Sequence, residues 1–377
     1  MRFINIKKWV IVVIAAMLPS YVLAFDAAAP YAILMDYDTG QVLYEKGADD
    51  PLNPSSMSKM MTTYVVFDYL KNNKLSKDQQ FFASANIANI EGSKMFIAPG
   101  DKATVEELLY GAIVQSGNDA CMVLAENISG SEEGFVKEMN AHAKKLNLNN
   151  TQYDNCMGFS SPNHMTTARD LAKLAQRLIT DFPEYYHYNA VKEWSFNNIT
   201  QQNRNRSLGF YGIDGIKTGH TEAGGYGITV SALHDNRRII AVINGLPSEK
   251  ARKKDIESLV EYAFKGFDKY QFAKALAPLG TVLVWYGAQE TVSIGTEKDL
   301  SAFLEKGTDS GKLRAALYYD SPVLAPLVEG QELGIIKIYN DDILLVEGKV
   351  IALKDVGKSG FFRKIWYNVR YILGIYN

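Results

Sequence analysis

Cysteine and histidine are scarce in this sequence. Its 377 residues include 2 cysteines and 5 histidines, and they form neither an H-E-x-x-H pattern nor a Cys/His spacing typical of a metal site. The two cysteines, Cys121 and Cys156, are too few for a disulfide-stapled scaffold. Cys121 lies in an apolar run, which favours a buried free thiol. We therefore expect no metal ion and no other cofactor.

Positive charge is not in excess either. The 40 Lys and Arg residues are matched by 42 Asp and Glu, for a formal net charge of −2, so we expect no nucleic-acid partner. No G-x-S-x-G nucleophile motif occurs, and Gly357-Lys358-Ser359 lacks the first glycine of a phosphate-binding loop. The remaining composition, 47% hydrophobic and 22% charged, is that of a globular protein long enough for two domains.

No apolar run near the N-terminus is long enough to span a bilayer comfortably. The run Trp9 to Leu18 has about ten residues, whereas a spanning helix needs about 20. Three basic residues precede it, and Val22-Leu23-Ala24 offers a cleavage site. Residues 1–24 are therefore predicted to be a secretory signal peptide, with an uncleaved N-terminal anchor as the alternative.

The rest of the chain changes character twice. Residues 25–266 have strand patterns at both ends and helix patterns between them, which predicts a mixed α/β (α+β) domain around an antiparallel sheet. Turn residues at positions 38–40 and 234–236 predict a hairpin near each end. Residues 267–355 contain short β-patterned runs separated by Gly and Pro, which predicts a small all-β domain, a sandwich or a barrel.

Residues 356–377 predict an amphipathic helix. At 100° per residue, its aromatic and aliphatic side chains, including Phe361, Phe362 and Trp366, fall on one arc. The segment has four basic residues and no acidic one, a composition typical of a helix that lies in a membrane interface. The alternative is a terminal helix that docks on the β domain.

The candidate nucleophile lies in an S-x-x-K motif, Ser56-Met57-Ser58-Lys59, at the start of a predicted helix. Positions i and i+3 of a helix share a face, so the lysine amine can approach the serine hydroxyl. A serine hydroxyl needs a neighbouring base, and a lysine can be that base only if its pKa is lowered. The helix N-terminus also directs backbone N–H groups toward an oxyanion formed on this serine.

Two further motifs follow in the chain. Ser116-Gly117-Asn118 is an S-x-N motif between helical patterns, and Lys217-Thr218-Gly219 is a K-T-G motif after a strand pattern. Each motif is short enough to occur by chance. Their order, with spacings of 60 and 101 residues from serine to serine to lysine, is that of the penicillin-recognising serine enzymes.

With these motifs, the sequence resembles a low-molecular-mass penicillin-binding protein of the D-alanyl-D-alanine carboxypeptidase family. The same resemblance is carried by Ala29-Pro30-Tyr31-Ala32, Gln202-Asn203-Arg204-Asn205 and Asp214-Gly215-Ile216-Lys217-Thr218-Gly219-His220-Thr221. A β domain followed by an amphipathic C-terminal anchor is also this family's arrangement. The resemblance implies a DD-peptidase/β-lactamase-like catalytic domain with a helical subdomain.

The family's catalytic roles transfer to four residues. Ser56 would attack the carbonyl of the penultimate D-alanine, and Lys59 would take its proton. Ser116 would relay a proton to the leaving D-alanine and, with Lys59, help to activate the deacylating water. The backbone N–H groups of Ser56 and His220 would form the oxyanion hole.

The substrate-binding roles transfer in the same way. Asn118 would bind the substrate backbone, Lys217 would act as a cation near the substrate carboxylate, and Thr218 would donate from its hydroxyl. Arg204 and Arg252 match basic residues near the family's site, although either could be an ordinary surface arginine.

The resemblance also implies substrate and location. The substrate would be the peptidoglycan pentapeptide that ends in D-Ala-D-Ala, trimmed during cell-wall maturation with an effect on cell shape, and β-lactam antibiotics would be covalent inhibitors. The enzyme would be exported and peripheral on the periplasmic face of the inner membrane, held by its C-terminal helix.

One stretch departs from the family pattern. Tyr153 to Phe159 replaces a stretch that often carries His-Gly-Leu, and the pattern resumes at His164. We expect the departure to alter the wall of the cleft without touching the three catalytic motifs.

Two other functions are considered. A serine β-lactamase of the same superfamily is opposed by the absence of a Glu-x-x-Leu-Asn run between residues 119 and 216. A non-catalytic envelope protein that binds peptidoglycan is opposed by the three intact motifs.

Overall fold

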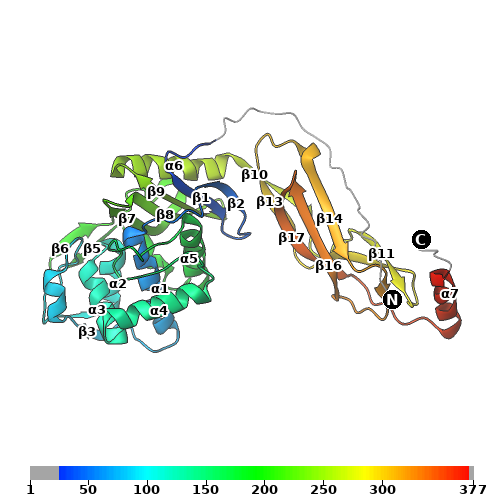
Figure 1. Ribbon diagram of the computed structural model, residues 1–377, viewed down its shortest axis with the longest axis horizontal. Helices are drawn as coiled ribbons and strands as arrows, with labels where there is room; N and C mark the ends of the chain where they lie inside the picture. Colours follow the sequence, from blue (N-terminus) through cyan, green and yellow to red (C-terminus); the bar gives the residue numbers. More distant parts are fainter. Residues whose placement is uncertain (1–24, 373–377) are drawn as a thin grey trace. The chain divides into compact units, whose positions relative to one another are not determined.

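Residues 25–372 are described by the computed structural model, so the predicted signal peptide over residues 1–24 lies outside the described residues. The chain divides after Gly266 into two compact units (Figure 1). The first unit is a mixed α/β structure around an antiparallel sheet, and the second is built mainly from β-strands. These features confirm the predicted fold class.

The first unit has the strands of its main sheet toward both ends of its sequence and most of its helices between them. Its strands are β1 (Tyr31–Asp36), β2 (Val42–Lys46), β3 (Gln80–Phe82), β4 (Lys102–Thr104), β5 (Glu193–Phe196), β6 (Ile199–Gln202), β7 (Ile213–Thr221), β8 (Gly225–His234) and β9 (Arg237–Leu246). Its helices are η1 (Ser55–Ser58), α1 (Lys59–Lys71), η2 (Ala85–Asn89), α2 (Val105–Val114), α3 (Asn118–Ser129), α4 (Glu132–Lys145), α5 (Ala168–Asp181), η3 (Tyr186–Ala190), η4 (Phe210–Gly212) and α6 (Glu249–Lys265).

Five strands form the main sheet, in the order β2-β1-β9-β8-β7, and all neighbours are antiparallel. The predicted hairpin turns at residues 38–40 and 234–236 connect β1 to β2 and β8 to β9. Residues Ile239 to Ile243 of the central strand β9 form a continuous aliphatic run, because both faces of this strand are buried. The strand contacts helices α5 and α6. Strand β7 lies at one edge, so one row of its backbone groups is unpaired within the sheet.

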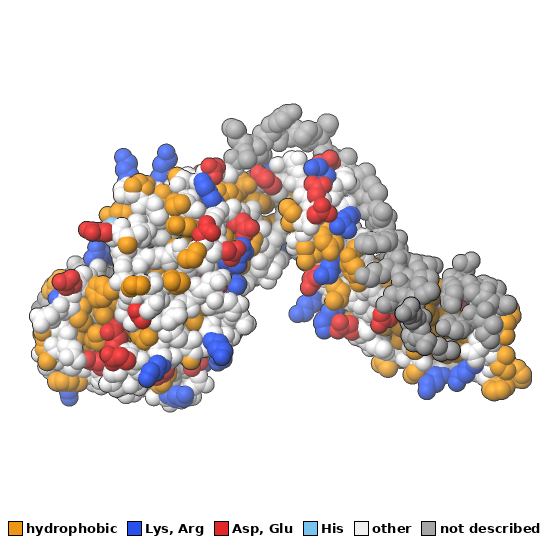
Figure 2. Space-filling model, in the orientation of Figure 1, with side chains coloured by type: hydrophobic (Ala, Val, Ile, Leu, Met, Phe, Trp, Pro, Cys, Tyr) orange, Lys and Arg blue, Asp and Glu red, His pale blue; other side chains and the backbone are white. Residues whose placement is uncertain are grey.

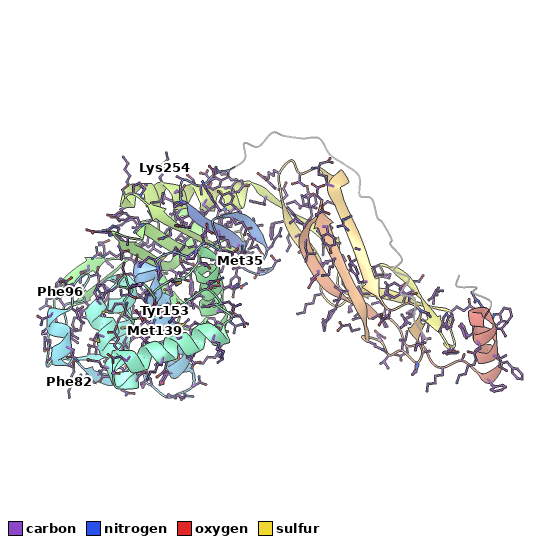
Figure 3. The ribbon with its side chains drawn as sticks, in the orientation of Figure 1. Met35, Phe82, Phe96, Met139, Tyr153 and Lys254 are labelled. Carbon is purple, nitrogen blue, oxygen red and sulfur yellow. The ribbon has the colours of Figure 1, made fainter. Side chains whose placement is uncertain are left out.

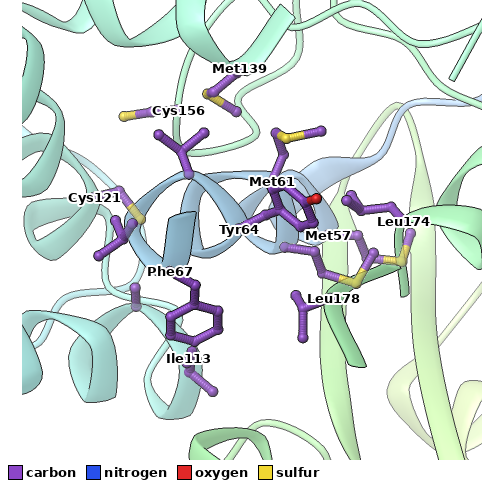
Figure 4. Packing of buried hydrophobic residues seen from close by; sticks show 14 of the residues in the cluster. Met57, Met61, Tyr64, Phe67, Ile113, Cys121, Met139, Cys156, Leu174 and Leu178 are labelled. Carbon is purple, nitrogen blue, oxygen red and sulfur yellow. The ribbon is translucent and has the colours of Figure 1, made fainter. Parts of the chain in front are cut away.

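Helix α1 lies at the centre of the helical part. Ten of its 13 residues are buried, and it contacts α2, α3, α4 and α5, so it has packing partners on nearly every side. Figure 4 shows Met61, Tyr64 and Phe67 of this helix packed among residues of the neighbouring elements. Cys121 and Cys156 lie near α1 and are both buried and free, which confirms the prediction for Cys121.

The second unit contains two sheets. Its strands are β10 (Phe267–Ala273), β11 (Gly280–Trp285), β12 (Thr291–Thr296), β13 (Leu300–Glu305), β14 (Leu313–Tyr319), β15 (Val323–Leu324), β16 (Glu332–Asn340) and β17 (Ile343–Ala352), with a short helix η5 (Ser310–Lys312). Six of them form a sheet in the order β14-β16-β17-β12-β11-β15, and β10 pairs with β13.

The second unit ends in helix α7 (Phe361–Ile372). Tyr367 is buried against Trp285 and Tyr286, and the Tyr286 hydroxyl donates to Asn368 Oδ1 at 2.7 Å, so the helix docks on the β-strands. Its apolar residues Phe361, Phe362, Ile365 and Trp366 remain exposed, and Figure 2 shows hydrophobic side chains where Figure 1 places α7. The helix is therefore docked and also presents an apolar surface.

Candidate active site

The S-x-x-K residues lie where a 3₁₀ turn passes into a helix. Ser56 belongs to η1, and Lys59 is the first residue of α1. About one helical turn separates their side chains, and Lys59 Nζ lies 3.0 Å from Ser56 Oγ. Ser55, the residue before Ser56, has φ of 49°, a left-handed conformation that is uncommon for residues other than glycine.

Lys59 is fully buried, and its hydrogen-bond partners within residues 25–372 include no carboxylate. Besides Ser56 Oγ, its Nζ contacts Asn118 Oδ1 at 2.7 Å and the Met157 main-chain oxygen at 2.6 Å. Burial lowers the pKa of this amine, against the opposing effect of two buried thiols and Asp119. A neutral amine has two hydrogens, which suit Asn118 and Met157, and a lone pair that then faces the Ser56 hydroxyl. This is the arrangement of a general base.

The contact from Met157 corrects one expectation from the sequence. The stretch Tyr153 to Phe159 does touch a catalytic motif, because the Met157 carbonyl oxygen accepts a hydrogen bond from Lys59. The contact comes from the main chain, so the identity of the side chain at position 157 gives no sign of it. Gly158 and Phe159 also line the cleft, as expected for its wall.

The S-x-N motif lies between α2 and α3. Ser116 has φ of 62°, and its buried Oγ has no hydrogen-bond partner in the described part of the chain. Asn118 begins α3, and its side chain bridges Lys59 to the Glu91 main-chain oxygen, to which Nδ2 donates at 2.7 Å. The unpartnered Ser116 hydroxyl lines the cleft, where it can exchange a proton with substrate or water.

The K-T-G motif lies on edge strand β7. Lys217 is buried, and its Nζ donates only to the Thr218 main-chain oxygen, at 3.2 Å, among the contacts of the described residues. Burial, and then the charge on Lys59, lowers the pKa of Lys217. A side chain at Gly219 would place its Cβ 2.9 Å from the Pro54 carbonyl oxygen, so glycine lets β7 lie against the turn that carries Ser56.

The predicted site residues come together around one cleft of about 460 Å³. Seven of them line it, namely Ser56, Ser116, Asn118, Arg204, Thr218, His220 and Arg252. Lys59 and Lys217 are buried behind this lining. Within residues 25–372, no group of three or more His, Cys, Asp or Glu side chains is arranged to hold a metal ion.

The cleft also contains residues that the sequence analysis missed. Tyr226 stacks on His220 with ring centroids 3.8 Å apart, and the Arg252 guanidinium lies 5.9 Å from the Tyr226 ring. Arg252 also pairs with Glu249 at 3.3 Å, three residues earlier on α6, and Arg206 adds another cation to the lining. The i,i+3 spacing of Glu249 and Arg252 was a usable signal, whereas nothing local to Tyr226 pointed to the cleft.

Each unit of the chain matches a known protein family. The family described as D-alanyl-D-alanine carboxypeptidase matches residues 18–248, and the family described as Penicillin-binding protein 5, C-terminal domain, matches residues 267–358.

Curated relatives match over most of their length. The chain is 37% identical over 351 residues to D-alanyl-D-alanine carboxypeptidase DacD of Salmonella typhimurium, covering 91% of this chain and 89% of the relative. It is 38% identical over 343 residues to DacC of Escherichia coli, covering 89% and 86%. Among solved structures, penicillin-binding protein 5 from Haemophilus influenzae is similar with a TM-score of 0.79 and 33% identity, covering 90% of this chain and all of that one.

Proposed function

The chain belongs to the D-alanyl-D-alanine carboxypeptidase family and is a serine-type D-Ala-D-Ala carboxypeptidase, and we propose that Ser56 carries its acyl-enzyme. The observation that carries this assignment is the Lys59 Nζ at 3.0 Å from Ser56 Oγ, buried and without a carboxylate partner. Among the serine hydroxyls that line the cleft in the described part of the chain, the Ser56 hydroxyl has a lysine amine within hydrogen-bond distance.

Acylation proceeds by attack of Ser56 Oγ on the carbonyl carbon of the penultimate D-alanine. The hydroxyl proton passes to Lys59, and the tetrahedral oxyanion accepts hydrogen bonds from the backbone N–H groups of Ser56 and His220. When the C–N bond breaks, the Ser116 hydroxyl gives its proton to the D-alanine nitrogen and takes one from Lys59, which returns to its neutral form. The buried and unpartnered Ser116 Oγ supports this relay.

Deacylation reverses the proton movements with water in place of Ser56. Lys59, helped by Ser116, takes a proton from a water molecule as the water attacks the ester carbonyl. Ser56 Oγ then leaves with a proton from Lys59. A β-lactam enters the same sequence through its ring carbonyl. Its leaving nitrogen stays attached to the acyl group, so the inhibitor remains covalently bound until the ester is hydrolysed.

The substrate carboxylate is held on the cationic side of the cleft. Lys217 has no carboxylate partner in the part of the chain that the structure describes, so an incoming carboxylate would favour its charged form and offset the cost of burying that charge. Thr218 offers a hydroxyl donor, and Arg204 and Arg252 add guanidinium groups to the lining. The free edge of β7 suits an extended peptide, which can pair with it as an added strand.

The cellular location is part of the same proposal. The enzyme is exported, trims peptidoglycan pentapeptides during cell-wall maturation, and rests on the periplasmic face of the inner membrane. The support is the exposed apolar surface of α7 and the signal-like sequence of residues 1–24. Each helix in the described part of the chain is too short or too polar to cross a bilayer.

Mapping of the acylated residue tests this proposal. Purified enzyme should release D-alanine from a pentapeptide ending in D-Ala-D-Ala, and a labelled penicillin should be found on the tryptic peptide that contains Ser56. Ser56→Ala should abolish both, whereas Ser93→Ala, another serine of the cleft lining, should still be labelled. Label that persists on a different residue of Ser56→Ala would disprove the assignment.

A further inference from the structure

The segment from Tyr153 to His164 packs directly against the turn that carries Ser56. The main chain of Tyr153 makes two hydrogen bonds to the side chain of Asn140 on α4, at 2.8 and 2.9 Å. Figure 3 labels Tyr153 within the first unit. Asn155 Oδ1 accepts from the backbone N–H groups of residues 157, 158 and 159. The segment is therefore internally fixed before it meets the nucleophile turn.

The contact with the turn runs through one buried histidine. His164 Nε2 lies 2.7 Å from Ser58 Oγ, and Ser58 Oγ donates to the Ser55 main-chain oxygen at 2.8 Å. On its other side, His164 Nδ1 accepts the backbone N–H of Asp154 at 3.0 Å. His164, Ser58 and Ser55 are all buried, so the chain of hydrogen bonds is shielded from water.

These contacts determine the tautomer of the imidazole. Nδ1 accepts a backbone N–H, so it carries no proton, and the ring hydrogen must be on Nε2. Nε2–H then donates to Ser58 Oγ, which leaves the Ser58 proton free to reach the Ser55 carbonyl. A protonated ring would place a second hydrogen against the Asp154 N–H, and burial lowers the pKa of His164 to about 4.

The group at the end of this chain is a strained one. Ser55 has φ of 49°, and its carbonyl carbon joins the nitrogen of Ser56, one of the proposed oxyanion donors. Gly158 closes over the same carbonyl, since a Cβ there would lie 1.9 Å from the Ser55 oxygen. Rotation of this peptide group would move both the N–H and the Oγ of Ser56.

The opposite side of Ser55 is held separately. Ser55 N–H donates to Asn53 Oδ1 at 3.0 Å, and its Oγ lies 3.1 Å from Thr221 Oγ1 at the end of β7. The side chain and N–H of Ser55 thus make contacts toward the main sheet, whereas its carbonyl accepts a hydrogen bond from the Ser58 hydroxyl that His164 contacts.

We propose that His164 is a positioning residue for the nucleophile: as the neutral Nε2–H tautomer, it holds Ser58 and the Ser55 carbonyl, and so sets the orientation of Ser56. This inference rests on the proposed role of Ser56. His164, where the family pattern resumes, also connects the departing stretch to the turn, since it accepts the backbone N–H of Asp154.

Kinetics of penicillin acylation separate positioning from general stability. His164→Leu removes both hydrogen bonds and should lower the first-order acylation constant roughly tenfold or more, with little change in the binding constant of the antibiotic. His164→Gln keeps a donor and an acceptor and should recover most of the rate. Phe135→Leu, a buried change in α4 away from the cleft lining, is the control for lost stability.

A double-mutant cycle tests the proposed route. Ser58→Ala removes the next hydroxyl in the same chain of hydrogen bonds. The double variant His164→Leu with Ser58→Ala should therefore slow acylation no more than either change alone. Additive effects of the two changes would overturn the link between them. Equal slowing by Phe135→Leu at the same loss of Tm would reduce His164 to a structural role.

The tautomer can be observed in the wild-type enzyme, which guards against variants that fail to fold. In ¹⁵N-histidine-labelled protein at pH 7, the His164 ring should show a protonated Nε2 and an unprotonated Nδ1. A protonated Nδ1, or a charged ring, would overturn the proposal. Mapping of the penicillin adduct to Ser56 in the same sample keeps this result distinct from failure of the proposed function.

Discussion

Two buried lysines of the first unit and two surface lysines of the second have opposite surroundings. In the first unit, Lys59 and Lys217 are buried with no carboxylate partner among the described residues, and burial lowers the pKa of each. In the second unit, Lys337 pairs with a glutamate at 2.8 Å and Lys349 with another at 2.7 Å, and the hydrogen bond to each partner raises the lysine pKa. The same residue type therefore has a lowered pKa at these two sites of the first unit and a raised pKa at these two sites of the second.

Because the pKa shifts of the two kinds of lysine have opposite directions, their contributions to folding stability change oppositely with pH. A lysine whose pKa is lowered in the folded state binds fewer protons there than in the unfolded chain, so its contribution to stability rises with pH up to the ordinary value of 10.5. A lysine whose pKa is raised contributes stability at neutral pH and loses it only above 10.5. Burial of two unpaired amines in the first unit thus costs stability at neutral pH, a cost that the chemistry of the cleft explains.

Substitution of the buried base should have the largest effect. Lys59→Arg keeps a cation that does not deprotonate, so acylation by penicillin and release of D-alanine should fall by about 10²–10⁴-fold. Stopped-flow measurement of the acylation rate checks this expectation. Lys349→Arg in the second unit is the matched control and should leave the rate unchanged. Residual activity of Lys59→Arg with the wild-type pH dependence would remove Lys59 from the role of base.

Loss of the second buried lysine should have a smaller effect. Lys217→Ala removes the cation that would meet the substrate carboxylate, and we expect acylation by peptide and by penicillin to fall roughly 10–100-fold while the protein stays folded. The second-order acylation constant and the Tm are the measurements. An unchanged rate for both substrates would show that Lys217 does not bind the carboxylate.

The pH dependence of acylation sharpens the contrast between the lysines. Only the neutral form of Lys59 can take the Ser56 proton, and its pKa is lowered by burial. The acylation rate should therefore rise with pH and reach a plateau below the ordinary lysine value of 10.5. Rates measured with a β-lactam that does not titrate between pH 6 and 10 test this. A rate that keeps rising beyond pH 10.5 would mean that burial does not lower the pKa of Lys59.

The smallest effect on catalysis is expected from the helix at the end of the second unit. Phe362→Asp combined with Trp366→Asp places charges on the exposed surface of α7 but spares Tyr367, which docks the helix. The protein should leave lipid vesicles and keep its rate on soluble peptide. Sedimentation with vesicles as strongly as the wild type would contradict membrane binding through α7 and point to the N-terminal segment.

Elements with a regular pattern were predictable from the sequence. Strands β14 (Leu313–Tyr319) and β17 (Ile343–Ala352) contain alternating and aliphatic residues that match a half-buried strand. Strand β10 has no such pattern. Its residues Asp268 to Gln271 are exposed and mostly polar, so β10 is specified by its pairing with β13 and not by its own pattern.

Some parts of the candidate site were predictable from the sequence and others were not. Side chains with a characteristic chemistry, such as Ser56 and Lys59, could be found from the order of the motifs. Contacts made by the main chain could not, as the Met157 carbonyl on Lys59 shows. The left-handed conformations of Ser55 and Ser116 were also invisible in the sequence, since tertiary contacts and not local propensity hold them.

Titration of the Lys59 amine itself would show whether burial prepares the base. With ¹³C-labelled lysine, the Cε resonance of Lys59, assigned with Lys59→Arg, reports the protonation of Nζ in the free enzyme. The structure predicts a midpoint below the ordinary value of 10.5, while Lys349 in the second unit titrates above it. A Lys59 midpoint at or above 10.5 would contradict the assignment of Lys59 as the base that activates Ser56.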